Sequence, residues 1–128
     1  MKFLLDTCTF LWIASDDPHL SATSRECFQD PDNSIYLSSV SVWEIMVKHA
    51  LGRLPLPGQP ERFIPEMRSK HGITPLPLEE EAVFYLTRLP ELHKDPFDRM
   101  LICQALAHGL IMLTPDELLR QYPVTTKW

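Results

Sequence analysis

The sequence predicts an α/β domain with a mainly parallel sheet, and three observations lead to this prediction. Short apolar runs typical of buried strands alternate with longer segments that have the apolar spacing of helices. Turn-forming residues separate most of these segments. The chain has 128 residues, of which 45% are hydrophobic. This is enough apolar material for one core, so we expect a single domain over residues 1–128.

The first elements follow from apolar runs and turn chemistry. Residues 2–6 form an apolar run that predicts a buried strand, and the segment 9–15 after it predicts a helix. The turn sequence Asp16-Asp17-Pro18 ends this helix. Ser21 can then cap a second helix that extends to Phe28.

The middle of the chain is expected to hold a strand over residues 35–37 and a helix over residues 42–51. The apolar residues of this helix keep the i, i+3, i+4 spacing of a core-facing side, and they are Trp43, Met46, Val47, Ala50 and Leu51. A proline-rich loop over residues 54–60 separates this helix from the next one.

The remaining chain continues the alternation of helices and strands. Gly72 and Gly109 each follow a helical segment, as is typical of a helix C-terminus. The expected helices are residues 61–70, 79–89, 96–108 and 115–119, and the expected strands are residues 73–76, 110–113 and 124–126.

Composition argues against several classes of protein. No apolar run reaches the roughly 18–20 residues needed to cross a bilayer, so no membrane association is expected. The three cysteines form no Cys-x-x-Cys pair, which favours a reducing cytoplasm over a disulfide framework or a zinc ribbon. The net charge of −5 does not favour a nucleic-acid-binding protein, but basic residues such as Lys48 and Arg99 lie close in sequence to the acids considered next.

Four acidic residues stand where a strand-like run gives way to a helix start, and they are Asp6, Glu44, Asp98 and Asp116. Because the carboxyl ends of parallel strands meet at one edge of a sheet, these side chains can share a pocket. Clustered carboxylates repel one another and resist ionisation unless a cation lies between them. The pattern therefore favours a Mg²⁺ or Mn²⁺ site.

Each of the four acids also has a structural explanation. Asp6 could cap the first helix, and Glu44 could pair with Lys48 one helical turn later. Separate capping residues are available at the other helix starts, namely Ser41, Asp95 and Thr114. The common location of the four acids at strand ends favours a shared site over four coincident caps.

Other catalytic motifs are missing from the sequence. The serines occur in no Gly-x-Ser-x-Gly elbow, and the four glycines form no phosphate-binding loop. What remains is chemistry by acids and metal, that is, hydrolysis of phosphoryl or phosphodiester groups.

Four sequence blocks resemble the PIN-domain family. They are Leu4-Leu5-Asp6-Thr7, Ser39-Val40-Ser41-Val42-Trp43-Glu44-Ile45, His93-Lys94-Asp95-Pro96-Phe97-Asp98-Arg99-Met100-Leu101 and Leu113-Thr114-Pro115-Asp116. Their order and intervals agree with that family over essentially the whole chain. The His-x-Asp-Pro-Phe-Asp-Arg block resembles the subgroup of VapC-type toxins from type II toxin–antitoxin systems. The resemblance implies a three-layer α/β/α sandwich and a Mg²⁺- or Mn²⁺-dependent endoribonuclease.

The resemblance also implies roles for individual residues. Asp6, Glu44 and Asp98 align with the first three metal-binding acids, and Asp116 aligns with a fourth position that is often weaker. The residues expected to cap helices or to support the ligands are Asp95, Ser41 and Thr114. Lys94 and Arg99 are candidate phosphate contacts because they are basic and lie beside Asp98. The implied partners are an RNA substrate, a cognate antitoxin and a second copy of the chain in a homodimer.

Two other functions fit the same fold class. A phospho-receiver domain also has an acidic Mg²⁺ pocket, but this chain lacks paired acids after its first strand and a lysine at the end of a late strand. A catalytically silent PIN-like module that binds RNA or a protein would keep the fold without the chemistry. Assaying RNA cleavage discriminates between this module and the nuclease.

Overall fold

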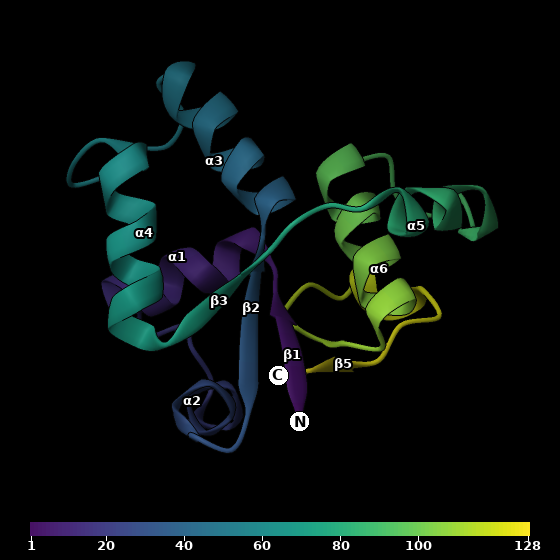
Figure 1. Ribbon diagram of the computed structural model, residues 1–128, viewed down its shortest axis with the longest axis horizontal. Coiled ribbons are helices and arrows are strands. Elements are labelled where there is room, and N and C mark those ends of the chain that lie inside the picture. The colour runs from purple at the N-terminus through teal and green to yellow at the C-terminus, as the bar shows by residue number, and fades with distance from the viewer.

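The computed structural model describes residues 1–128 and contains a five-stranded sheet with the order β3-β2-β1-β4-β5 (Figure 1). All four strand pairings are parallel. The strands are β1 (Lys2–Leu5), β2 (Ser34–Ser38), β3 (Ile73–Leu76), β4 (Ile111–Leu113) and β5 (Thr126–Lys127). The predicted α/β class with a parallel sheet is confirmed.

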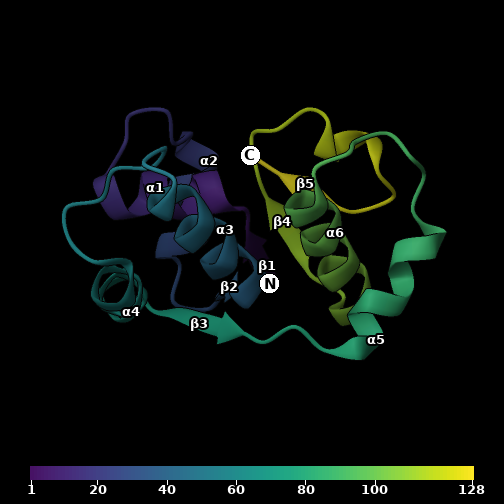
Figure 2. The same cartoon turned by 90° about the horizontal axis from the view of Figure 1, so that it is seen from above.

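Helices cover both faces of this sheet. They are α1 (Thr7–Ser15), α2 (Ala22–Gln29), α3 (Ser39–Ala50), α4 (Pro60–His71), α5 (Glu80–Val83) and α6 (Pro96–His108). Figure 2 shows α1 to α4 on one side of the strands and α5 and α6 on the other. The molecule therefore has three layers, as the resemblance implied.

The central strand β1 joins two hydrophobic cores. Phe3 and Leu5 face the core beneath α1 to α4, whereas Leu4 faces the core beneath α6. Alternate side chains of a strand point to opposite faces of the sheet, so a strand covered by helices on both faces must be apolar throughout. All three of these side chains are fully buried, which explains the unbroken apolar run at the start of the chain.

Most helix ends are made by residues with clear capping chemistry. The Ser21 hydroxyl accepts a hydrogen bond from the Ser24 amide at 3.0 Å at the start of α2. Gly109 ends α6 with a φ of 64°, a left-handed conformation that a side chain would disfavour.

Two predicted helices are wrong in the second half of the chain. The expected helix over residues 79–89 divides into α5 and a 3₁₀ segment, Phe84–Arg88. Residues 115–118 form no helix, and a 3₁₀ turn, Leu119–Gln121, appears instead. The Thr114 hydroxyl accepts a hydrogen bond from the Asp116 amide at 3.1 Å, which closes a local turn in competition with a helix. Thr114 is therefore not a helix cap.

The side of α3 that the apolar spacing assigned to the core faces solvent. Trp43 is 57% exposed and Leu51 is 61% exposed. The buried residues of α3 are Val40, Ser41, Glu44 and Ile45. Two polar residues thus occupy the inward face, and their burial is explained below by the site that they form.

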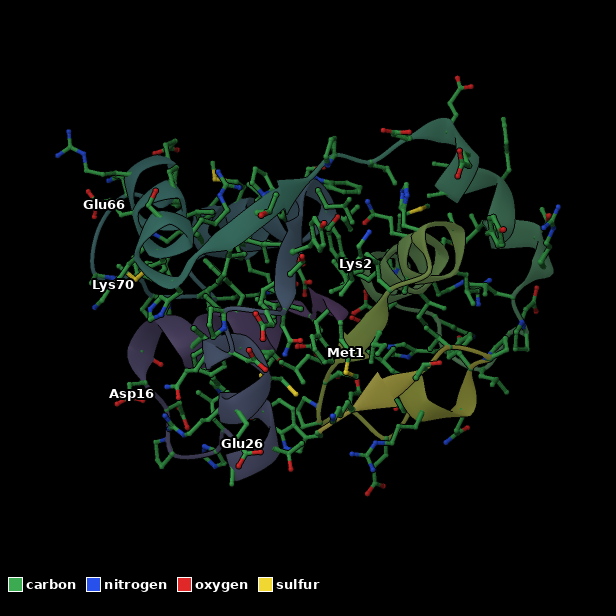
Figure 3. All side chains as sticks on the ribbon, turned by 60° about the horizontal axis from the view of Figure 1, so that its bottom comes forward. Met1, Lys2, Asp16, Glu26, Glu66 and Lys70 are labelled. Carbon is green, nitrogen blue, oxygen red and sulfur yellow. The ribbon has the colours of Figure 1, made fainter.

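The two ends of the strands differ in what they carry. Figure 3 shows Met1 and Lys2 near the amino ends, where the chain enters β1, and Glu66 and Lys70 on the outer side of α4. The acids predicted to bind metal lie at the opposite, carboxyl edge. None of the helices combines the length and the apolar character required to traverse a bilayer.

Candidate metal centre

The order of strands and helices brings the predicted acids to the carboxyl edge of the sheet. Asp6 follows β1 directly, and Asp116 lies three residues beyond the end of β4. Glu44 projects from α3, which begins immediately after β2 (Figure 1). Asp98 comes from the first turn of α6 in the opposite helix layer (Figure 2). Such an edge is where open parallel sheets bind their ligands.

Asp6 is held on both of its carboxylate oxygens. Its Oδ1 accepts a hydrogen bond from the Thr9 amide at 2.8 Å, so Asp6 is the N-cap of α1. Its Oδ2 accepts one from the Thr114 hydroxyl at 2.5 Å. Burial raises the pKa of Asp6 despite these hydrogen bonds, and the charge of Asp116 raises it further. The capping explanation is therefore confirmed for this residue, and its second oxygen is bound by Thr114 from the end of β4.

Glu44 is also buried and fully engaged. Its Oε1 accepts a hydrogen bond from the Thr7 hydroxyl at 2.6 Å, and its Oε2 lies 2.5 Å from the Lys48 ammonium. The ion pair expected one helical turn along α3 is thus confirmed. Ser41 is not a helix cap, because Ser38 caps α3 through the Val40 amide.

Ser41 and Thr7 instead support the position of Glu44. Ser41 Oγ lies 3.0 Å from Thr7 Oγ1 inside the protein, which places both hydroxyls behind the glutamate. Sequence reasoning missed Thr7. The available signal was a polar side chain directly after Asp6, at the point where a buried strand enters an apolar helix.

Asp98 lies in the first turn of α6 and is half-buried. His93 Nε2 lies 2.9 Å from Asp98 Oδ2, in a hydrogen bond that joins the loop before α6 to the helix. Burial is the main reason that the pKa of Asp98 rises to about 6, and the charges of Asp95 and Glu44 add to it against the His93 hydrogen bond. Asp95 itself caps α6, since its Oδ1 accepts from the Phe97 and Asp98 amides at 2.9 and 3.2 Å.

Asp116 is the last of the four predicted acids along the chain. It is only half-buried, and its Oδ1 accepts a hydrogen bond from the Leu118 amide at 2.9 Å. Thr114 connects it to Asp6, because the same hydroxyl binds the Asp116 amide and the Asp6 carboxylate. The negative charge of Asp116 therefore acts on Asp6, where it helps to raise the pKa.

The basic residues beside Asp98 differ in how free they are. Arg99 Nη1 donates to the Pro90 carbonyl at 3.0 Å and lies 3.4 Å from the Tyr122 hydroxyl. It thus ties the loop before α6 to the C-terminal part of the chain. Lys94 is exposed beside the site.

The donor set fits a hard divalent cation. One ligand atom from each of His93, Asp95 and Asp98 lies within 4.8 Å of the other two, and this group includes one of the four predicted acids. Burial is the main reason that the pKa values of Asp6 and Asp98 are raised, and a bound cation would offset this cost by stabilising the ionised carboxylates. Carboxylate oxygens suit Mg²⁺ or Mn²⁺, and the imidazole of His93 is already hydrogen-bonded to Asp98.

We expect divalent metal to stabilise the fold in a pH-dependent way. The folded pKa of Asp98 lies above its value of 3.8 in the unfolded chain. The folded state therefore favours the protonated acid, and stability is lost as pH rises from about 4 through about 6. Mg²⁺ binds the ionised form, so it should raise the free energy of unfolding at pH 7 more than at pH 4.5.

Urea denaturation with Mg²⁺ or EDTA at these two pH values measures the effect. Asp98→Asn is the matched variant, because it removes the titrating group and keeps its size. In EDTA its stability relative to the wild type should increase between pH 4.5 and 7. A relative stability that is constant with pH would show that Asp98 does not carry this penalty.

Comparisons with known proteins add to this geometry. The sequence model of the PIN domain family matches residues 3–124 of this chain. Ribonuclease VapC16 of Mycobacterium tuberculosis is 36% identical over 66 residues, which are 48% of this chain and 47% of that protein. The match to this curated relative thus spans about half of its length.

Solved structures are similar over nearly the whole chain. VapBC2 from Rickettsia felis, bound to a DNA fragment from their promoter, has a TM-score of 0.76 at 15% identity and covers 99% of this chain and 98% of that chain. VapBC-5 from Mycobacterium tuberculosis, a member of the VapBC family of toxin-antitoxin systems, has a TM-score of 0.56 at 16% identity, with 94% and 89% covered. At such identities the likeness concerns the fold.

Proposed function

Because this chain belongs to the PIN domain family, we propose that it is a Mg²⁺- or Mn²⁺-dependent endoribonuclease and the toxin of a type II toxin–antitoxin pair. The observation that carries this proposal is the placement of Asp6, which is buried, and Asp98, which is half-buried, at one sheet edge, which they reach from opposite helix layers. Carboxylates are kept in such a place at a cost in stability, which metal binding offsets.

Four residues would hold the cation, directly or through water, namely Asp6, Glu44, Asp98 and Asp116. The bound ion would activate water for attack on a phosphodiester and offset the charge that develops on phosphate oxygens. Thr9 and Thr114 orient Asp6, and Thr7 orients Glu44. Such supporting hydrogen bonds fix ligand geometry before substrate arrives. Lys94 is exposed beside Asp98, where its ammonium can contact the phosphate backbone of RNA. The guanidinium of Arg99 is hydrogen-bonded to the loop before α6, so Lys94 is the better candidate for a phosphate contact.

The topology disfavours the phospho-receiver alternative. A receiver sheet has the flavodoxin-like order 2-1-3-4-5, in which the third strand neighbours the first. In this chain β2 lies between β1 and β3, and β4 lies on the other side of β1. The silent PIN-like module keeps the same topology, so only an activity measurement separates it from the nuclease.

The test is cleavage of single-stranded RNA by the purified full chain. We expect cleavage with Mg²⁺ or Mn²⁺, loss of cleavage in EDTA, and recovery when metal is restored. Single-stranded DNA of the same sequence serves as a substrate control. A chain that binds metal and RNA but leaves the RNA intact would support the silent module.

Two protein partners belong to the proposal. A cognate antitoxin would cover the acidic site with a segment that offers an arginine or lysine to the carboxylates, and the toxin–antitoxin description of a similar structure supports it. The homodimer would use the apolar residues Phe63 and Met67, which line a hollow beside α4. This hollow lies on the helix layer away from Asp98, so dimer and antitoxin need not compete.

A further inference from the structure

Lys48 is a charged side chain of the site that the proposed reaction does not yet use. It lies on α3 one turn after Glu44, and its Nζ is 2.5 Å from Glu44 Oε2. The lysine side chain is 46% exposed, whereas the glutamate is 6% exposed. The ammonium therefore reaches from the surface into the site, where the buried carboxylate needs a counter-charge.

Both oxygens of Glu44 have a partner from the chain. One accepts from the Thr7 hydroxyl and the other from Lys48. Each oxygen keeps a further lone pair, but a cation that bound Glu44 directly would lie next to the positive charge of Lys48 unless that ammonium moved. Thr7 is buried and also contacts Ser41, so Lys48 is the group that can move.

Acids of the opposite helix layer also interact electrostatically with the Lys48 ammonium. Its pKa is raised, first by the hydrogen bond to Glu44 and further by the charges of Glu44, Asp95 and Asp98, against its partial desolvation. The observation that matters for the site is the position of this ammonium, which lies on an oxygen of Glu44, one of the four predicted acids. Hydrolases with two metals place their second ion among such acids, about 3.5–4 Å from the first.

We propose that the Lys48 ammonium takes the place of a second divalent ion, so that the site binds a single Mg²⁺ or Mn²⁺. This inference rests on the proposed function for the identity of the metal. The divalent ion would be held on the Asp6, Asp98 and Asp116 side, and Glu44 would act through Lys48 or a water molecule. The three N–H donors of the ammonium suit a phosphate oxygen of the substrate, as a second metal would.

The experiment is a titration of the full chain with Mn²⁺ in the absence of RNA, followed by calorimetry and by the electron paramagnetic resonance of free Mn²⁺. The wild type should bind a single Mn²⁺. Lys48→Met, which keeps the stem and removes the charge, should bind a second Mn²⁺ at the same concentrations. Lys48→Arg should return the stoichiometry to a single ion. Lys70→Met is the matched control, because Lys70 is an exposed lysine on α4 (Figure 3) and should leave the stoichiometry unchanged.

Several results would overturn the inference. Two Mn²⁺ ions on the wild type would show that Lys48 excludes none, and this result does not depend on any variant folding. A single ion on Lys48→Met, with the far-ultraviolet circular dichroism of the wild type, would show that the charge of Lys48 does not set the stoichiometry.

The inference and the proposed function fail separately. If the wild type binds a single Mn²⁺ and Lys48→Met binds a second, but RNA stays intact, the role assigned to Lys48 stands and the nuclease proposal is wrong. If the wild type cleaves RNA with two ions bound, the nuclease proposal stands and the role assigned to Lys48 is wrong.

Discussion

Replacing Asp98 by Asn is expected to lower the rate of RNA cleavage by at least about 100-fold, because groups that merely support metal ligands already contribute about 10- to 100-fold. Asn keeps the size of the side chain and a hydrogen-bond acceptor for His93, but it removes the negative charge that holds the cation. Single-turnover cleavage with saturating Mg²⁺ measures the loss. Asp6→Asn should have a comparable effect, and Asp116→Asn a smaller one because Asp116 aligns with the weaker fourth position of the family.

Two controls make the Asp98→Asn result specific. Glu117→Gln removes a charge next to Asp116 from an exposed side chain and should leave cleavage unchanged. Thermal unfolding of Asp98→Asn in EDTA should show a folded protein, since the neutral amide suits a half-buried place better than a carboxylate does. If Asp98→Asn cleaved RNA at the wild-type rate, Asp98 would not be a metal ligand of the proposed site.

Replacing Phe3 by Ala is expected to lower the free energy of unfolding by about 3–5 kcal/mol. Phe3 is fully buried in the central strand, where it packs in the core beneath α1 to α4. The change leaves a cavity that the surrounding helices cannot fill without moving. Domains of this kind are stable by only about 5–15 kcal/mol, so the variant should approach the limit of folding. Urea denaturation followed by tryptophan fluorescence measures the difference.

Phe84→Ala is the matched control for this prediction. Phe84 is 67% exposed at the start of the 3₁₀ segment after α5, so its truncation should change stability by less than about 0.5 kcal/mol. Equal losses in the two variants would mean that β1 is not the centre of the core.

The parts of the fold that could be predicted are those with local chemical causes. Ser21, Gly72, Asp95 and Gly109 mark helix ends because each satisfies backbone groups within a few residues. The buried strands could be found because a sheet covered on both faces requires continuous apolar runs. The edge location of the four acids followed from parallel topology alone.

Other features could not be predicted because tertiary contacts decide them. The apolar stripe of α3 that includes Trp43 and Leu51 has the spacing of a core face, yet the site draws Ser41 and Glu44 inward instead. Periodicity does not distinguish an inward polar face from an outward apolar one. The hydrogen bond from Thr7 to Glu44 joins residues 37 positions apart, so no local pattern contains it.

The hydrogen bond from Thr114 to Asp6 joins residues that are 108 positions apart, across the pairing of β1 with β4. A ribosome makes the chain from its amino end, and β1 and β2 can pair early while β4 is still absent. During that time Asp6 lacks Thr114 and Asp116, so the proposed site is incomplete. The proposed site is therefore completed only when the last quarter of the chain has been made and β4 has paired with β1.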